Sequence, residues 1–123
     1  QIDVWGSAFA VSTRACSAEQ KYRITEYLTV HRSEVFRYGQ VRHLPAPAHW
    51  HAYQHAPNML PGMYQNGGYW ATPLVWVLAA ISHNRSLVEQ VLEEVTDDFK
   101  VRGVWEAVNW HLNYTGARDY VAS

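Results

Sequence analysis

Residues 63–76 read MYQNGGYWATPLVW and place an irregular backbone directly before the most apolar helix that the sequence predicts. Gly67 and Gly68 can adopt positive φ and allow a close approach of the backbone to a neighbour. Pro73 is tolerated only in the first turn of a helix, so we expect the helix to begin near Trp70. Its free N–H groups would then face whatever the loop surrounds. The stretch therefore predicts a binding loop at a helix N-terminus.

Composition places the chain among globular domains and limits the classes of partner that we expect. The 123 residues are 48% hydrophobic and 17% charged, which is enough apolar content to bury one core. Ten Lys and Arg balance eleven Asp and Glu and no basic run occurs, so nucleic acid and anionic membranes are not expected partners. The longest apolar run, residues 74–81, is far too short for a membrane span. Cys16 is the only cysteine, which excludes an intramolecular disulfide.

The sequence predicts two similar helical hairpins, over residues 3–30 and 69–100. In each, a run of small and apolar residues precedes a more polar, amphipathic segment. Ser17 and Ser86 open the second helix of each hairpin, because each stands three residues before a Gln or Glu, the capping-box spacing. Asp3 is interpreted as an N-cap of the first helix.

Between and after the hairpins the helical periodicity is absent. Residues 33–68 predict a short β-hairpin with Gly39 at its turn, followed by a long loop. Residues 101–123 are expected to form a C-terminal loop. The predicted fold class is therefore mainly α, a single partial domain of helical hairpins. Two hairpins cannot enclose helices that are apolar all round, so self-association or pairing with a missing part of the fold is expected.

Aromatic residues are more numerous than an ordinary core requires, with six Trp and eight Tyr in the chain. Trp and Tyr each carry a polar group that needs a partner when buried. Such a surplus suits a carbohydrate-binding surface. The alternative is that these side chains fill the core between helices.

The Asn-Gly-Gly loop resembles a motif of the six-hairpin (α/α)6-toroid glycosidases, in which loops before the inner helices line the sugar pocket. Neutral invertases have a similar Tyr-His-Asn-Gly-Gly-x-Trp-Pro segment, and trehalases have an Asn-Gly-Trp-Ala-Pro segment. The resemblance implies that the residues binding the sugar are Gln65, Asn66, Gly67, Gly68, Tyr69 and Trp70.

A second segment, residues 103–109, has the sequence GVWEAVN and resembles the Tyr-Glu-Lys-Tyr-Asp segment that carries the catalytic base of trehalases. This resemblance implies that Glu106 is a general base and that Trp105 adds a wall to the pocket. Residues 116–120 and 2–7 also resemble parts of these enzymes, a glycine-rich loop and the start of an earlier inner helix. Nearly the whole chain is thus similar to the C-terminal part of such a toroid.

The resemblance implies hydrolysis of a glycosidic bond with inversion of configuration, and no cofactor. Gln65 stands where invertases have His, and Ala71 and Thr72 precede the proline, so the sugar specificity of either family is not carried over. Glycoside hydrolysis takes two carboxyl groups, and this superfamily supplies the acid from an earlier hairpin. The chain is therefore expected to be an inactive fragment of the hydrolase.

Other chemistries have weaker support. His49, His51 and His55 lie close in sequence, but no fourth ligand is spaced to complete a zinc site, so no metal is predicted. Cys16 has no partner motif and is interpreted as a small buried residue. The alternative to the glycosidase is a non-catalytic helical module for binding or assembly.

Overall fold

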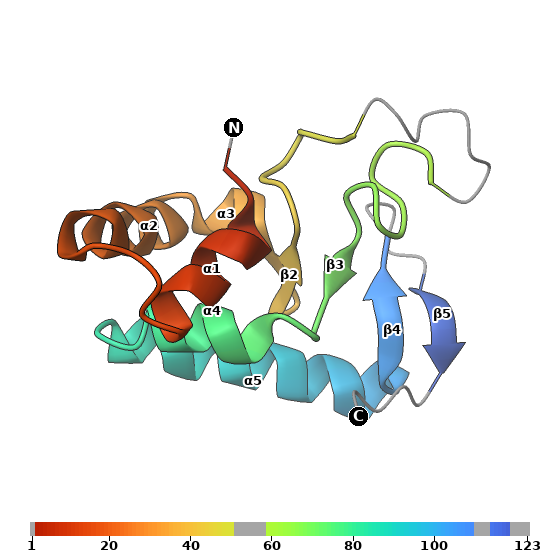
Figure 1. Ribbon diagram of the computed structural model, residues 1–123. Coiled ribbons are helices and arrows are strands. Elements are labelled where there is room, and N and C mark those ends of the chain that lie inside the picture. The colour runs from red at the N-terminus through yellow and green to blue at the C-terminus, as the bar shows by residue number, and fades with distance from the viewer. Residues whose placement is uncertain (1, 51–58, 110–113, 119–123) are drawn as a thin grey trace.

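The computed structural model describes residues 2–50, 59–109 and 114–118, which combine helices with an antiparallel sheet (Figure 1). The elements in chain order are α1 (Val4–Ser12), α2 (Ala18–Val30), α3 (Arg32–Val35), β1 (Phe36–Arg37), β2 (Gln40–Arg42), β3 (Tyr69–Trp70), α4 (Leu74–Ala80), α5 (Arg85–Arg102), β4 (Trp105–Val108) and β5 (Tyr114–Arg118).

The sheet has five strands in the order β1-β2-β3-β4-β5, and each neighbouring pair is antiparallel. Val41 lies opposite Phe36 on one side and Trp70 on the other, while Tyr69 pairs with Val108 of β4. The expected mainly α fold, with helical hairpins from part of an (α/α)6 toroid, is therefore wrong. The chain belongs to a mixed class of helices and antiparallel strands.

Two segments account for this correction. Tyr69 and Trp70 form the central strand β3, where Tyr69 is paired on both sides, instead of opening a helix. Helix α4 begins at Leu74, with Pro73 as its N-cap residue. The expected C-terminal loop contains β4 and β5. Pairing partners distant in sequence thus decide the conformation here, which a local pattern does not reveal.

The N-terminal helical hairpin agrees with its capping signals. The Asp3 side chain accepts a hydrogen bond from the backbone N–H of Gly6, so Asp3 is the N-cap of α1. Ser17 and Gln20 form the predicted capping box of α2. The prediction for α5 is shifted, because the helix begins at Arg85 and Asn84 accepts the capping hydrogen bond in place of Ser86.

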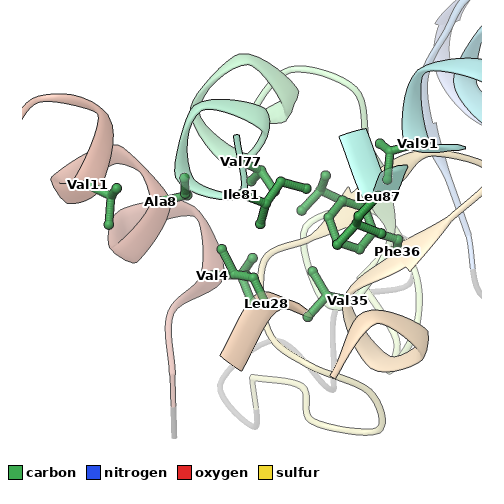
Figure 2. Packing of buried hydrophobic residues seen from close by; sticks show 12 residues of the cluster. Val4, Ala8, Val11, Leu28, Val35, Phe36, Val77, Ile81, Leu87 and Val91 are labelled. Atoms are coloured by element: carbon green, nitrogen blue, oxygen red, sulfur yellow. The ribbon is translucent and has the colours of Figure 1, made fainter. Parts of the chain in front are cut away.

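The hydrophobic core lies where α1, α2, α4 and α5 meet the β1–β2 side of the sheet (Figure 2). Its buried members are Val4, Ala8, Val11, Leu28, Val35, Phe36, Val41, Val77, Ala80, Ile81, Leu87 and Val91. Burial of each larger aliphatic side chain contributes about 1.5–3 kcal/mol. The Thr25 hydroxyl donates to the Ala80 carbonyl oxygen at 3.0 Å and connects α2 to α4.

Helix α5 holds the β1–β2 turn through close backbone contact. Gly39, at φ +69°, is the turn residue that the sequence predicts. A Cβ at this position would lie 2.4 Å from the Val91 carbonyl oxygen and 2.5 Å from the Val95 nitrogen. The Gly39 N–H also donates to Glu94, which forms an ion pair with Arg32. Only glycine fits both the space and the conformation.

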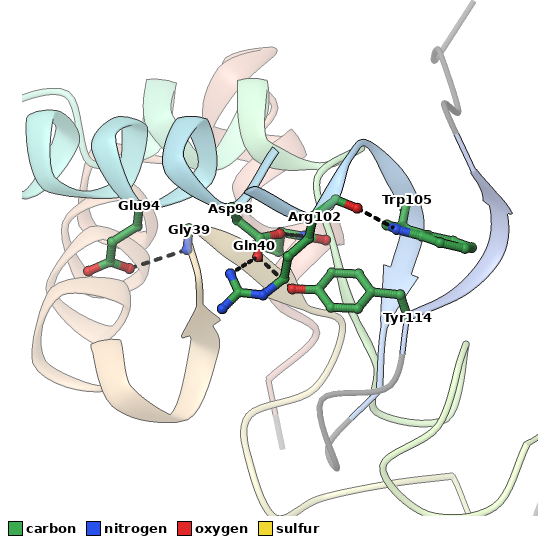
Figure 3. A network of polar contacts seen from close by, with 7 residues as sticks. All are labelled: Gly39, Gln40, Glu94, Asp98, Arg102, Trp105 and Tyr114. Carbon is green, nitrogen blue, oxygen red and sulfur yellow. Dashed lines mark hydrogen bonds and ion pairs between the residues drawn. The ribbon is translucent and has the colours of Figure 1, made fainter. Parts of the chain in front are cut away.

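A buried polar network joins the C-terminal end of α5 to β2 and β5 (Figure 3). Asp98 is 2% exposed and accepts hydrogen bonds from Gln40 at 3.0 Å, Arg102 at 2.9 Å and Tyr114 at 2.6 Å. Burial and the hydrogen bond to Asp98 raise the pKa of Tyr114 well above its usual value. The network satisfies a buried charge with three donors, as a stable interior requires.

No helix within the described ranges is both long and apolar enough to cross a bilayer.

Candidate functional site

The Asn-Gly-Gly loop is built around two glycines with different roles. Gly67 has φ +112°, which confirms the predicted positive φ, and a Cβ there would lie 2.3 Å from Nη2 of Arg42. A Cβ on Gly68 would lie 2.5 Å from the Tyr64 carbonyl oxygen. Burial lowers the pKa of Arg42, whose guanidinium donates to the Ala48 carbonyl oxygen at 2.8 Å. The glycines therefore let the loop close onto a buried arginine and onto itself.

Asn66 holds the loop together with its side chain. It is fully buried, its Nδ2 donates to the Met59 carbonyl oxygen at 2.7 Å, and its Oδ1 accepts from the Trp50 backbone N–H at 2.5 Å. Both ends of the amide are used inside the protein. Asn66 therefore shapes the loop from within, while Gln65 beside it is exposed.

Tyr64 is held in the loop by several hydrogen bonds to its backbone. Its φ is +39°, an uncommon conformation for a bulky residue that surrounding contacts must maintain. Its N–H donates to Oδ1 of Asn109 at 2.8 Å, and its carbonyl oxygen accepts from the Gly68 N–H at 2.8 Å and from Nε1 of Trp70 at 3.3 Å. The backbone of Tyr64 is thus held by hydrogen bonds on both sides, through its N–H and through its carbonyl oxygen.

The Tyr64 hydroxyl donates to Oε1 of Glu106 at 2.5 Å. An O–H···O distance this short is characteristic of a charge-assisted hydrogen bond to a carboxylate. Glu106 lies on β4 and is partly exposed. The structure therefore brings the predicted base to the Asn-Gly-Gly loop through Tyr64, for which the sequence alone predicts no role.

Aromatic rings continue from Tyr64 across the sheet toward the start of α1. Centroid distances are 4.9 Å from Tyr64 to Trp70, 5.9 Å from Trp70 to Trp5, 5.1 Å from Trp5 to His43 and 5.6 Å from His43 to Trp50. Tilted and edge-to-face contacts at such distances are favourable. We call these five rings the aromatic array. It connects the Glu106 end of the site with the N-terminus of α1.

The array ends in a polar cluster at the start of α1. Nε1 of Trp50 donates to Nδ1 of His43 at 3.2 Å, and Nε2 of His43 lies 3.3 Å from Oδ1 of Asp3. The indole nitrogen can only donate, so Nδ1 must accept and Nε2 carries the hydrogen that faces Asp3. The sequence predicts only a capping role for Asp3 and no role for His43.

Two further predicted site residues, Tyr69 and Trp105, make other contacts. Tyr69 is buried under the guanidinium of Arg42, 5.5 Å from the ring centroid. The Trp105 indole donates to the Arg102 carbonyl oxygen at 2.9 Å, and its ring lies 6.1 Å from that of Tyr114. The structure thus brings Trp70 and Glu106 to Tyr64, and it places Gly67 and Tyr69 against the same Arg42 guanidinium. Trp105 lies beside Tyr114.

The described residues hold no cluster of potential metal ligands, and two pockets lie among the helices. Within the described ranges no group of three or more His, Cys, Asp or Glu side chains forms a metal site. His49 lies there, whereas His51 and His55 fall outside those ranges. One pocket of about 480 Å³ lies between α2 and the end of α4, and another of about 720 Å³ lies between α1 and α2. Glu106 lines neither of them.

No protein-family model, curated protein or solved structure was found to match this chain.

Proposed function

We propose that this chain supplies the base side of a glycoside hydrolase site. In this proposal Glu106 is the general base, the partly exposed ring of Tyr64 contacts the sugar with the buried Trp70 packed behind it, and a carboxylic acid from the rest of the complete protein protonates the leaving group. The reaction is hydrolysis of a glycosidic bond with inversion. It needs no cofactor.

The hydrogen bond from Tyr64 to Glu106 is the observation that carries the proposal. A base must be held in a fixed orientation beside the substrate, and here a tyrosine with a constrained backbone holds one carboxylate oxygen at 2.5 Å. The same tyrosine ring lies 4.9 Å from Trp70. An oriented carboxylate next to aromatic rings suits a sugar, which presents both hydroxyl groups and an apolar ring face.

The proposed chemistry assigns one proton transfer to this chain. Glu106 removes a proton from water as the water oxygen bonds to the anomeric carbon and the glycosidic C–O bond breaks. The leaving oxygen then needs a proton from a second carboxyl group, which inverting enzymes place about 6.5–9.5 Å from the base. Glu94 and Asp98 are used in ion pairs on α5 and do not serve this purpose. The isolated chain is therefore proposed to be inactive.

The experiment compares the isolated chain with the complete gene product that contains it. Both are incubated with trehalose, sucrose and maltose, and sugar release and the anomeric configuration of the first product are followed by NMR. We expect release with inversion from the complete protein and none from residues 1–123. Release by the isolated chain would overturn the assignment of the acid, and no release by either protein would overturn the proposed function.

A second candidate function, an assembly module, is favoured by the apolar surface of α1 and α4. Phe9 is 46% exposed and Val75 is 66% exposed, and the Phe9 ring contacts Trp76 at 5.2 Å. Such a surface supports self-association or pairing with the remainder of the complete protein. Light scattering of Phe9→Ser/Val75→Ser against the unmodified chain tests it. An unmodified chain that stays monomeric and binds no hydrophobic dye contradicts it.

A further inference from the structure

We propose that Asp3, His43 and Trp50 form a second sugar-binding subsite, at the end of the aromatic array opposite Glu106. The inference deepens the proposed function and rests on it, because it places a second sugar-binding position on the same chain as Glu106. Neither the capping role of Asp3 nor the proposed base chemistry requires this cluster.

His43 provides a fixed, neutral hydrogen-bonding group in the subsite. The Trp50 N–H occupies Nδ1 of His43, and this places the remaining hydrogen on Nε2, toward Asp3. The imidazole is thereby set in one tautomer and one orientation. A preset orientation reduces the entropy that a ligand must remove on binding.

Asp3 has one carboxylate oxygen engaged by the protein and one that is available. Oδ1 accepts from the Gly6 N–H at 2.9 Å and lies 3.3 Å from Nε2 of His43. Oδ2 has no hydrogen-bond partner among the described residues, and the side chain is 52% exposed. Oδ2 can therefore accept a hydrogen bond from a sugar hydroxyl, while Gly6 and His43 hold Oδ1 in place.

Trp50 supplies the apolar face of the subsite. It is 39% exposed, and its ring is anchored at both ends of the residue, through its backbone N–H to Asn66 and its indole N–H to His43. An anchored, exposed indole presents a rigid stacking face at little entropic cost. Asp3 and Trp50 both contact the same imidazole, so the hydrogen-bond acceptor and the stacking face lie about one ring apart.

The negative charge of the cluster argues against an anionic ligand. The Asp3 carboxylate disfavours an anion, and the neutral form of His43 adds no positive charge. A cation would also suit a carboxylate beside an indole. We take the neutral sugar because the proposed function of this chain supplies one, and the cation is an outcome of the test below.

The test follows the indole N–H signal of Trp50 in a proton–nitrogen NMR spectrum of the 123-residue chain. The Trp50→Phe variant assigns this signal and keeps a ring at the position. Trehalose, sucrose and maltose are titrated in turn, and choline is titrated as a cationic competitor. We expect a saturable shift with at least one disaccharide and none with choline.

Asp3→Asn is the decisive variant, because Asn preserves the N-cap while it removes the charge. It should keep the helix and weaken disaccharide binding roughly tenfold, since hydrogen bonds to a carboxylate are stronger than those to an amide. Trp50→Ala should weaken binding similarly. Tyr22→Ala, which removes an exposed aromatic ring on α2, should leave binding unchanged.

The outcomes separate this subsite from the proposed base. A disaccharide that shifts Trp70 but not Trp50, or that binds Asp3→Asn as tightly as the unmodified chain, overturns the second subsite and leaves the proposed function standing. Binding at Trp50 with full activity of Glu106→Gln in the complete protein supports the subsite and overturns the proposed base. Displacement of sugar by choline would show a cation site instead and overturn the inference.

Discussion

Asp98 and Glu106 are carboxylates that each accept a hydrogen bond from a tyrosine hydroxyl, yet the protein surrounds them differently. Asp98 is 2% exposed and accepts from Gln40, Arg102 and Tyr114, all of which lie within regular elements or at their ends. Glu106 is partly exposed, and a loop tyrosine at φ +39° donates to it. The three internal donors around Asp98 indicate a structural role, whereas Glu106 is oriented by a constrained loop and remains partly exposed, as the proposed function requires.

Removal of Asp98 should give the largest loss of stability. Asp98→Ala leaves the buried amide of Gln40 and the Tyr114 hydroxyl without their acceptor and separates Arg102 from its partner. The free energy of unfolding in urea should fall by about 3 kcal/mol. Asp97→Ala, at an exposed neighbouring position, is the control and should change it by less than about 0.5 kcal/mol. Equal losses of unfolding free energy in Asp98→Ala and Asp97→Ala would show that Asp98 has no special structural role, and would contradict the contrast with Glu106.

Gly67→Val should lower the free energy of unfolding less than Asp98→Ala does, but it should reduce activity more. The new side chain adopts φ +112° with strain and meets the Arg42 guanidinium, at a cost of about 1–3 kcal/mol. Because the loop positions Tyr64, activity of the complete protein should fall further than that loss of stability explains. Ala79→Val, at an exposed position of α4, is the control. Unchanged activity and unfolding for Gly67→Val would show that the loop is not the rigid support that we describe.

Tyr64→Phe removes the hydroxyl that orients Glu106 and keeps the ring on Trp70. The kcat of the complete protein should fall about tenfold, equivalent to about 1.4 kcal/mol, with KM nearly unchanged. Urea unfolding should change little, which distinguishes a positioning role from a structural one. If Tyr64→Phe lowers the free energy of unfolding but keeps kcat, the contact between Tyr64 and Glu106 is structural, like those of Asp98.

Ionisation of Tyr114 should give the smallest effect. Burial and Asp98 raise the pKa of Tyr114 above its ordinary value near 10, so the neutral phenol is favoured in the folded chain. This contribution is fully present below pH 10 and is lost as the pH rises above it, because only the unfolded chain then releases the proton. Unfolding free energies measured on both sides of pH 10 should therefore fall more steeply for the unmodified chain than for Tyr114→Phe. Parallel curves would contradict the assignment.

Local signals in the sequence predict the helices well and the sheet poorly. Asp3 and Ser17 act as caps through hydrogen bonds within one turn, and Gly39 marks its turn by conformation alone. Tyr69 belongs to a strand because Arg42 and Val108 pair with it from distant segments. Long-range pairing of this kind leaves no period in the sequence, which explains the mistaken mainly α class.

The candidate site is partly predictable for the same reason. The positive φ of Gly67 follows from its neighbours in the sequence and is confirmed. The role of Tyr64 depends on Asn109 and Glu106, and that of His43 depends on Asp3 and Trp50. Those contacts exist only after the sheet has formed. A tyrosine two residues before Asn66-Gly67-Gly68 is a signal that could have identified Tyr64.

Turnover of Glu106→Gln in the complete protein tests the central claim most directly. Glutamine keeps the shape of the side chain and can still accept from Tyr64, but it cannot take a proton from water. The account predicts that kcat falls by roughly 10²–10⁴ while KM changes little, and that Asp97→Ala leaves both values unchanged. A kcat for Glu106→Gln close to that of the unmodified protein would contradict it.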